Sequence, residues 1–295
     1  MKILILTGGN SSERKISFMS AKNVAKALKE NGHKVKVYDL KNGYGPIKKI
    51  AKDFDVIFPV LHGEEGEGGL LHKFISKINI RVVGTNNYIG LKKAWYKIPF
   101  KKFCDKNKIL TSLWKPIKKP EDVIKFGFPC VVKTSSGGSS REVFILKSKK
   151  DLLKFKKEIF KHKDLFVEQY LTGIEVTAAV LNNRALPILE IVPPQKGWFD
   201  YKNKYSGETK EIPNAPSLTG ESKKEVQKIA LKIHRFFDLG SYSRTDFIVD
   251  KKGKPYVLEI NTIPGMTEGS LVPKEAKAAG LTFNQMVEEL IKSAR

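Results

Sequence analysis

The chain has 295 residues, of which 41% are hydrophobic, and this is enough apolar surface to bury a large core, which excludes an intrinsically disordered protein. Its 54 Lys and Arg against 31 Asp and Glu give a net charge of +23, typical of proteins that bind nucleic acid, anionic membranes or phosphorylated ligands. Only seven of the 54 basic residues are Arg, and the lysines are spread along the chain among acidic residues. We therefore expect the lysines to lie on a solvated surface, and we expect no nucleic-acid partner.

Residues 1–86 predict an α/β domain built on a parallel sheet. Apolar runs predict strands over 2–7, 35–38, 55–60 and 80–83, and helical spacing predicts a helix over 70–75. A further helix follows the first strand, with one apolar face made of Phe18, Ala21, Val24, Ala25 and Leu28. Strands that alternate with helices form βαβ units, which give a parallel sheet.

The rest of the chain predicts two α+β lobes, over residues 87–168 and 169–295. The first contains a basic helix over 95–110 and strands over 129–133, 143–146 and 165–168. The second contains longer strands and two helices that open with capping boxes, Ser222 with Glu225 and Thr282 with Gln285. The fold class is therefore α/β with α+β lobes, in three domains.

Cysteine usage and hydropathy indicate the compartment. The chain has two cysteines, Cys104 and Cys130, without a CxxC spacing, which excludes a disulfide framework and a thiolate zinc site and fits a reducing compartment. The apolar run at the N-terminus is too short for a signal peptide, and no apolar run approaches 18 residues. We expect a cytoplasmic protein with no membrane partner.

A predicted β-hairpin over 243–261 carries the most informative polar residues. Asp250 and Pro255 flank the predicted turn. If these two residues lie opposite each other, four polar side chains share one face of the hairpin: Arg244, Asp246, Glu259 and Asn261. The other face is then apolar: Phe247, Val249, Leu258 and Ile260. Two carboxylates and an amide oxygen suit Mg²⁺, and an adjacent Arg suits an anionic transition state. The alternative is a solvated hairpin with an Arg–Asp ion pair.

Three loops rich in glycine follow predicted strands. The loop 133–140 joins Lys133 to small residues that let backbone N–H groups approach phosphate, although it lacks the P-loop pattern and could be a plain hairpin turn. The loop 7–13 is a strand-to-helix anion loop without GxGxxG, so a dinucleotide site is weakly supported. The loop 61–69 combines glycines and acids at the carboxyl end of a strand, which favours function over packing.

Taken in chain order, these motifs resemble those of the D-alanine–D-alanine ligases of the ATP-grasp superfamily, over nearly the whole chain. The matching segments are Thr7–Gly9 with Ser12–Arg14, Leu61–Gly63 with Gly66–Glu67, Lys133 with Gly138–Ser140, Tyr201 with Lys204–Tyr205, Arg244–Asp246, and Leu258–Thr267 with Ser270–Leu271. The resemblance implies an ATP-grasp fold behind an N-terminal parallel-sheet domain. It also implies an ATP-dependent, ADP-forming ligase that joins two D-alanines through an acyl phosphate, for peptidoglycan precursor synthesis.

The resemblance assigns roles to individual residues. The catalytic set is Glu13, Ser139, Tyr205, Arg244 and Gly265. The substrate-binding set is Glu13, His62, Ser270 and Leu271. The ATP-binding set is Lys133, Glu168, Gln169, Tyr170, Leu171, Glu175, Trp198 and Lys204. The metal ligands are Asp246, Glu259 and Asn261. The implied cofactors are ATP as co-substrate and two Mg²⁺, with Mn²⁺ as the alternative, and the implied assembly is a homodimer.

Some of these implied roles concern specificity and chemistry. Glu13 would bind the ammonium of the first D-alanine, positioned with Ser139 and Tyr205. Arg244 and the backbone of Gly265 would stabilise the oxyanion. A tyrosine at position 205 indicates the dipeptide type of ligase, because related depsipeptide ligases usually carry His there.

One departure from the family pattern concerns ATP. The family's Asp-Lys pair, whose Lys contacts the ATP phosphates, aligns with Ala94–Trp95, although Lys92, Lys93 and Lys97 lie close by. Either a neighbour substitutes or ATP is held more weakly. Past the 133–140 loop, Arg141–Glu142 replaces a small or apolar pair. Two alternatives stay open: an ATP-grasp ligase for another carboxylate–amine pair, and a catalytically weakened nucleotide-binding homologue.

Overall fold

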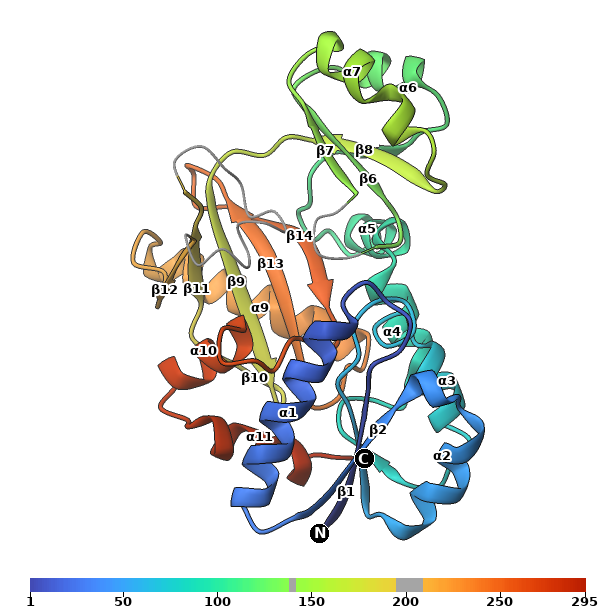
Figure 1. Cartoon of the computed structure of the whole chain (residues 1–295). Coiled ribbons are helices and arrows are strands. Elements are labelled where there is room, and N and C mark those ends of the chain that lie inside the picture. The colour runs from blue at the N-terminus through green and yellow to red at the C-terminus, as the bar shows by residue number, and fades with distance from the viewer. Residues whose placement is uncertain (138–141, 195–208) are drawn as a thin grey trace.

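The computed structural model describes residues 1–137, 142–194 and 209–295. In the described residues, three sheets follow one another along the chain, each covered by helices (Figure 1). The described helices include none long and apolar enough to cross a membrane. The division into domains over 1–86, 87–168 and 169–295 stays a prediction.

The first sheet is parallel, as expected, with strand order β2-β1-β3-β4. Its strands are β1 (Lys2–Thr7), β2 (Lys34–Asp39), β3 (Val56–Pro59) and β4 (Arg81–Val82). The helices of this part are α1 (Arg14–Glu30), α2 (Gly45–Ile50) and α3 (Leu70–Ile75), with 3₁₀ turns at Leu40–Asn42 and Ala51–Asp53. Alternate residues of β1 enter two cores, one on each face of the sheet.

The apolar face predicted for α1 is confirmed at four of its five positions. Ala21, Val24, Ala25 and Leu28 are buried. Phe18 is 36% exposed, so its assignment to the core was wrong. The Arg14 guanidinium lies 4.8 Å from the centre of the Phe18 ring, which keeps this ring covered by a cation at the surface.

The central part holds two helices and an antiparallel sheet of order β5-β8-β6-β7. Its strands are β5 (Trp114–Pro116), β6 (Cys130–Thr134), β7 (Val143–Leu146) and β8 (Leu165–Gln169). Its helices are α4 (Tyr88–Trp95), α5 (Lys97–Lys106), α6 (Pro120–Phe126) and α7 (Lys149–Ile159). The single helix predicted over 95–110 was wrong at both ends, because Tyr96 is extended and separates α4 from α5, and α5 ends at Lys106.

The last sheet has the order β12-β11-β9-β13-β14, with β10 also paired to β9. Its strands are β9 (Ile174–Leu181), β10 (Arg184–Ala185), β11 (Leu189–Val192), β12 (Lys210–Pro213), β13 (Tyr242–Val249) and β14 (Pro255–Asn261). Its helices are α9 (Gly220–Phe236), α10 (Leu271–Ala278) and α11 (Phe283–Lys292). The capping box of Thr282 is confirmed, but α9 begins earlier than predicted, because Thr219 caps it and Ser222 lies inside the first turn.

The β13–β14 hairpin contains a β-bulge that the predicted register did not include. Arg244 lies opposite Asn261 and Asp246 opposite Glu259, as predicted, but Val249, and not Asp250, lies opposite Pro255. The register shifts by one residue between Asp246 and Phe247, which lies opposite Val257. Val257 is therefore buried in the core, and the assignment of Leu258 to that face was wrong.

Parts of the molecule that are far apart in the chain share hydrophobic cores. One core joins α1 and the first sheet to β9, β13, α10 and α11, for example through Val24, Leu181, Val272 and Met286. A second core joins α4 and α5 to the last sheet and α9. A separate core lies between the central sheet and α6 and α7. The N-terminal and C-terminal sheets therefore hold a common interior, and the site lies between them.

Candidate active site

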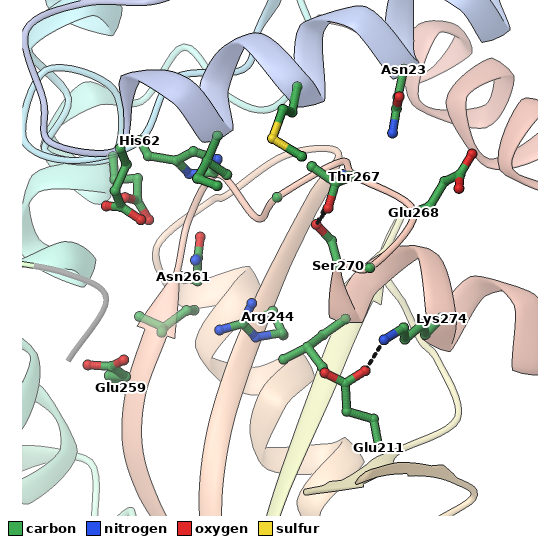
Figure 2. Close-up of a pocket in the computed structure, with 18 of the residues that line it drawn as sticks. Asn23, His62, Glu211, Arg244, Glu259, Asn261, Thr267, Glu268, Ser270 and Lys274 are labelled. Carbon is green, nitrogen blue, oxygen red and sulfur yellow. Dashed lines mark hydrogen bonds and ion pairs between the residues drawn. The ribbon is translucent and has the colours of Figure 1, made fainter. Parts of the chain in front are cut away.

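A cavity of about 730 Å³ lies where α1, the 62–67 loop, the β13–β14 hairpin and the start of α10 meet (Figure 2). Residues that are up to 261 positions apart in the chain, Glu13 and Lys274, line it together. Eight of the predicted site residues are among them: Glu13, His62, Arg244, Glu259, Asn261, Gly265, Ser270 and Leu271. The parallel sheet contributes through the loops at the carboxyl ends of β1 and β3, where ligand sites gather in α/β folds.

Arg244 is fixed in a buried ion pair at the floor of this cavity. Its Nε and one terminal nitrogen each donate to a carboxylate oxygen of Asp246 at 2.9 Å, and Thr177 donates to the same carboxylate at 2.6 Å. Burial disfavours the charge of Arg244, but Asp246 outweighs burial and raises the pKa of the guanidinium. The structure therefore holds a permanent, oriented positive charge beside the cavity.

Oxygen donors suited to a hard cation surround this arginine. Glu259 and Asn261 line the cavity, and Asp246 lies opposite Glu259 in the hairpin. The described part of the chain contains no cluster of three or more His, Cys, Asp or Glu side chains that could hold a metal. Two carboxylates and an amide oxygen still fit Mg²⁺, which takes few protein ligands and completes its shell with water and phosphate oxygens.

Lys97 brings a second cation to the cavity. Its Nζ lies 3.3 Å from Oε2 of Glu259 and donates to the carbonyl of Gly137 at 2.8 Å. Trp95, two residues earlier, also lines the cavity, whereas Lys92 and Lys93 are exposed. Of the three lysines near the Ala94–Trp95 departure, Lys97 is thus the one that the structure places at the site, because the break at Tyr96 turns α5 toward it.

A buried network of two lysines and one glutamate lies under the central sheet. Glu168 is 2.6 Å from Nζ of Lys133 and 2.6 Å from Nζ of Lys101, and Ser112 donates to it at 2.6 Å. Burial would raise the pKa of Glu168, but the two lysines hold it well below its usual value. Lys101 was not predicted, although it lies beside the buried Phe100 on α5. The network fixes the Lys133 ammonium group.

Removal of Lys101 should destabilise the fold. In Lys101→Met the charged Glu168 loses one of two cations at a buried position, which costs about 3–5 kcal/mol of unfolding free energy. Urea unfolding followed by far-UV circular dichroism measures this loss. Lys102→Met is the matched control, because Lys102 is exposed on the same helix and its loss should cost less than about 0.5 kcal/mol. Equal losses in the two variants would contradict the assigned role.

Two buried titratable side chains of the 61–69 loop, His62 and Glu67, lie near Glu13. Glu67 accepts from the backbone N–H of Gly63 at 2.8 Å, and burial together with Glu13 raises the pKa of Glu67 to about 8. His62 is buried, which lowers its pKa, and its Nε2 has no hydrogen-bond partner among the described residues. The 61–69 loop was predicted to be functional, but only His62 was assigned a role in it, so Glu67 was missed.

Gly265 is required by the close approach of Ser270. A Cβ atom at position 265 would lie 2.8 Å from Oγ of Ser270. That oxygen accepts from the backbone N–H of Thr267 at 3.0 Å and lies 2.8 Å from the Thr267 hydroxyl. The loop between β14 and α10 thus folds tightly over the cavity, with Ser270 at its end (Figure 2).

The other predicted ATP residues do not line this cavity. Glu168, Gln169, Tyr170 and Leu171 lie at the end of β8 and just beyond it, and Glu175 lies near the start of β9. Gln169 and Tyr170 are exposed, whereas Glu168 is committed to the buried network. Four predicted residues fall outside the described residues: Ser139, Trp198, Lys204 and Tyr205.

Comparison with known proteins bears on this arrangement. The family described as "D-ala D-ala ligase C-terminus" matches residues 97–292, which include the hairpin and α10. The chain belongs to the D-alanine–D-alanine ligase family. It is 36% identical to a D-alanine–D-alanine ligase of Maridesulfovibrio salexigens, over 99% of this chain and 98% of that one. It is also 36% identical to one of Aquifex aeolicus, over 99% and 100%.

Solved structures of this ligase family have the same fold. The D-alanine–D-alanine ligase of Bacillus anthracis superposes with a TM-score of 0.86 at 31% identity, over 99% of this chain and 97% of that one. The same enzyme complexed with ATP superposes with a TM-score of 0.85 at 30% identity, over the same shares. The expected ATP-grasp architecture behind a parallel-sheet domain is therefore confirmed.

Proposed function

We propose that the protein is an ATP-dependent ligase that joins two D-alanines to D-alanyl-D-alanine, through an acyl phosphate, for peptidoglycan precursor synthesis. The observation that carries the proposal is the cavity in which the fixed Arg244 faces the oxygen donors Glu259 and Asn261. The 36% identity to ligases of this name over nearly the whole chain supports the same activity.

The reaction has two steps. The carboxylate of the first D-alanine attacks the γ-phosphoryl group of ATP and gives an acyl phosphate and ADP. The amine of the second D-alanine then loses a proton and attacks the acyl carbon, and phosphate leaves. Positioning and charge neutralisation supply most of the catalysis in such steps.

The residues around the cavity divide this work. Glu13 holds the ammonium group of the first D-alanine next to His62, and the hydroxyl groups of Ser139 and Tyr205 position it. Arg244 and the backbone N–H of Gly265 stabilise the oxyanion of the tetrahedral intermediate. Ser270 and Leu271 receive the carboxylate of the second D-alanine at the start of α10.

The nucleotide would lie toward the central sheet. Lys97, Lys133 and Lys204 contact the phosphates. Lys97 supplies the positive charge that is missing at position 95, where this chain has Trp and the family has Lys. The 168–171 segment meets adenine, Glu175 the ribose, and Trp198 covers the nucleotide. Asp246, Glu259 and Asn261 would hold two Mg²⁺, or Mn²⁺, which would neutralise the charge of the phosphates.

Phosphate release from purified protein tests the proposal. With Mg-ATP and D-alanine we expect continuous phosphate release and a dipeptide product, identified by mass spectrometry. Release no faster than in the absence of D-alanine would overturn it. L-alanine and other amino acids as sole substrates separate this ligase from one for another carboxylate–amine pair. ATP binding without ADP formation in any mixture would indicate a weakened homologue.

Loss of the Lys97 charge should weaken ATP binding. In Lys97→Ala we expect the KM for ATP to rise about tenfold, because one charge-assisted contact to phosphate is worth about 1.4 kcal/mol. Steady-state phosphate release at varied ATP measures this change. Lys92→Ala is the control, because Lys92 is exposed on α4 and should leave the KM unchanged. An unchanged KM in Lys97→Ala would remove Lys97 from the nucleotide site.

Location and assembly are part of the same proposal. Cys104 and Cys130 are free and buried, which supports a reducing, cytoplasmic compartment. We also propose a homodimer, which light scattering of the purified protein tests; a mass equal to one chain would overturn it.

A further inference from the structure

Helix α10 is tied to the last sheet by a fully buried carboxyl group. Glu275 has no exposed surface, and its Oε1 accepts from the backbone N–H of Ala179 on β9 at 2.8 Å. Its other oxygen, Oε2, is buried without a hydrogen-bond partner among the described residues. A buried carboxyl group within an apolar core is costly, so its presence calls for a role beyond packing.

The strand pairing explains why Ala179 needs this partner. On one side of β9, residues up to Thr177 pair with β11, and Val180 and Leu181 pair with β10. Between these two segments the chain runs through Leu186 to Ile188, and Pro187 has no N–H. The carbonyl of Leu186 accepts from Gln227 on α9 at 2.8 Å. The Ala179 N–H is thus left without a strand acceptor, and Glu275 supplies one.

Glu275 connects α10, which contributes to the cavity wall, with the strand that lies next to Arg244. Ala179 is the register partner of Arg244, so the hydrogen bond fastens α10 beside the strand residue that faces the arginine. Leu271, which lines the cavity, lies four residues before Glu275 and therefore on the same face of α10. A second tie runs from Lys274 to Glu211 on β12 (Figure 2).

We propose that Glu275 is a positioning residue for the second substrate: its bond to Ala179 sets the start of α10, and with it Ser270 and Leu271, at a fixed place relative to Arg244. This inference rests on the proposed ligase function. Burial raises the pKa of Glu275 well above its usual value.

Substitutions at position 275 test the proposal through the two D-alanine sites. Glu275→Gln keeps an oxygen acceptor for Ala179 and should keep every kinetic constant within twofold. Glu275→Leu removes the acceptor at similar volume, and Glu275→Asp shortens the side chain so that it cannot reach. In both we expect the KM for the second D-alanine to rise about tenfold, with the KM for ATP unchanged. Lys277→Leu is the control, because Lys277 is exposed on the same helix.

Hydrogen exchange gives a second measurement that does not depend on activity. In Glu275→Leu and Glu275→Asp we expect faster exchange in peptides that cover 176–181 and 271–278, with Glu275→Gln close to the parent protein. An unchanged second-site KM and unchanged exchange in both variants would overturn the positioning role. Inactive parent protein with this exchange pattern would overturn the ligase proposal alone, and leave the anchoring of α10 in place.

Discussion

Arg244→Ala should abolish turnover. We expect kcat to fall about 10³-fold, because Arg244 supplies the one guanidinium among the described residues that line the cavity, at the place where negative charge develops. The ion pair with Asp246 orients this group in the free protein, so no reorganisation is needed when the tetrahedral intermediate forms. Phosphate release at saturating ATP and D-alanine measures the loss.

Arg244→Lys separates charge from geometry. The lysine keeps a positive charge next to Asp246 but cannot donate two hydrogen bonds in a fixed fork. We therefore expect it to fold, with a melting temperature close to that of the parent protein, and still to lose about 10²-fold in kcat. A folded Arg244→Lys variant with a normal rate would show that the arginine is structural and has no part in the reaction.

Glu259→Gln should cause the next largest loss. The amide has nearly the shape of the carboxylate but no charge, so the set of oxygen donors made of Asp246, Glu259 and Asn261 loses half of its negative charge. We expect kcat to fall at least about 10²-fold and the Mg²⁺ concentration that gives half-maximal rate to rise. Lys97, which lies 3.3 Å from Glu259, is also left with a weaker partner.

Glu268→Gln is the matched control for this variant. Glu268 lines the same cavity but is exposed, and it comes from the loop before α10 (Figure 2). We expect its kcat and its dependence on Mg²⁺ to stay within twofold of the parent protein. Should both glutamine variants lose activity equally, the effect would reflect the net charge of the cavity and not a ligand position at Glu259.

The hairpin was predictable because strand side chains alternate strictly. Arg244, Asp246, Glu259 and Asn261 fell on one face for that reason, and the paired register confirms it. The bulge was not predictable, because Val257 and Leu258 are both apolar and either one suits the core. The pairing of β13 with β9 runs without a break, so the extra residue of the bulge lies in β14.

The buried charged residues could not be predicted, because the composition of the chain masks them. With 54 basic residues in the chain, Lys101 in a basic helix has no local signal that separates it from the exposed Lys102 beside it. Glu275 likewise lies in a short helix beside Lys274, and its partner is a backbone group 96 residues away. Such residues are identified by strand pairing and packing, which a local pattern does not contain.

The shared cores also decide which parts of the molecule move as one body. The first sheet and the last sheet hold one common interior, and the C-terminal Arg295 accepts from and donates to Val82 through backbone hydrogen bonds. The α4–α5 pair is packed into the interior of the last sheet as well. In the described residues, the central sheet with α6 and α7 shares no buried apolar core with the other two sheets. It is held against α5 by the buried ion pair between Glu168 and Lys101, so loss of this pair should loosen the central sheet relative to the rest of the molecule.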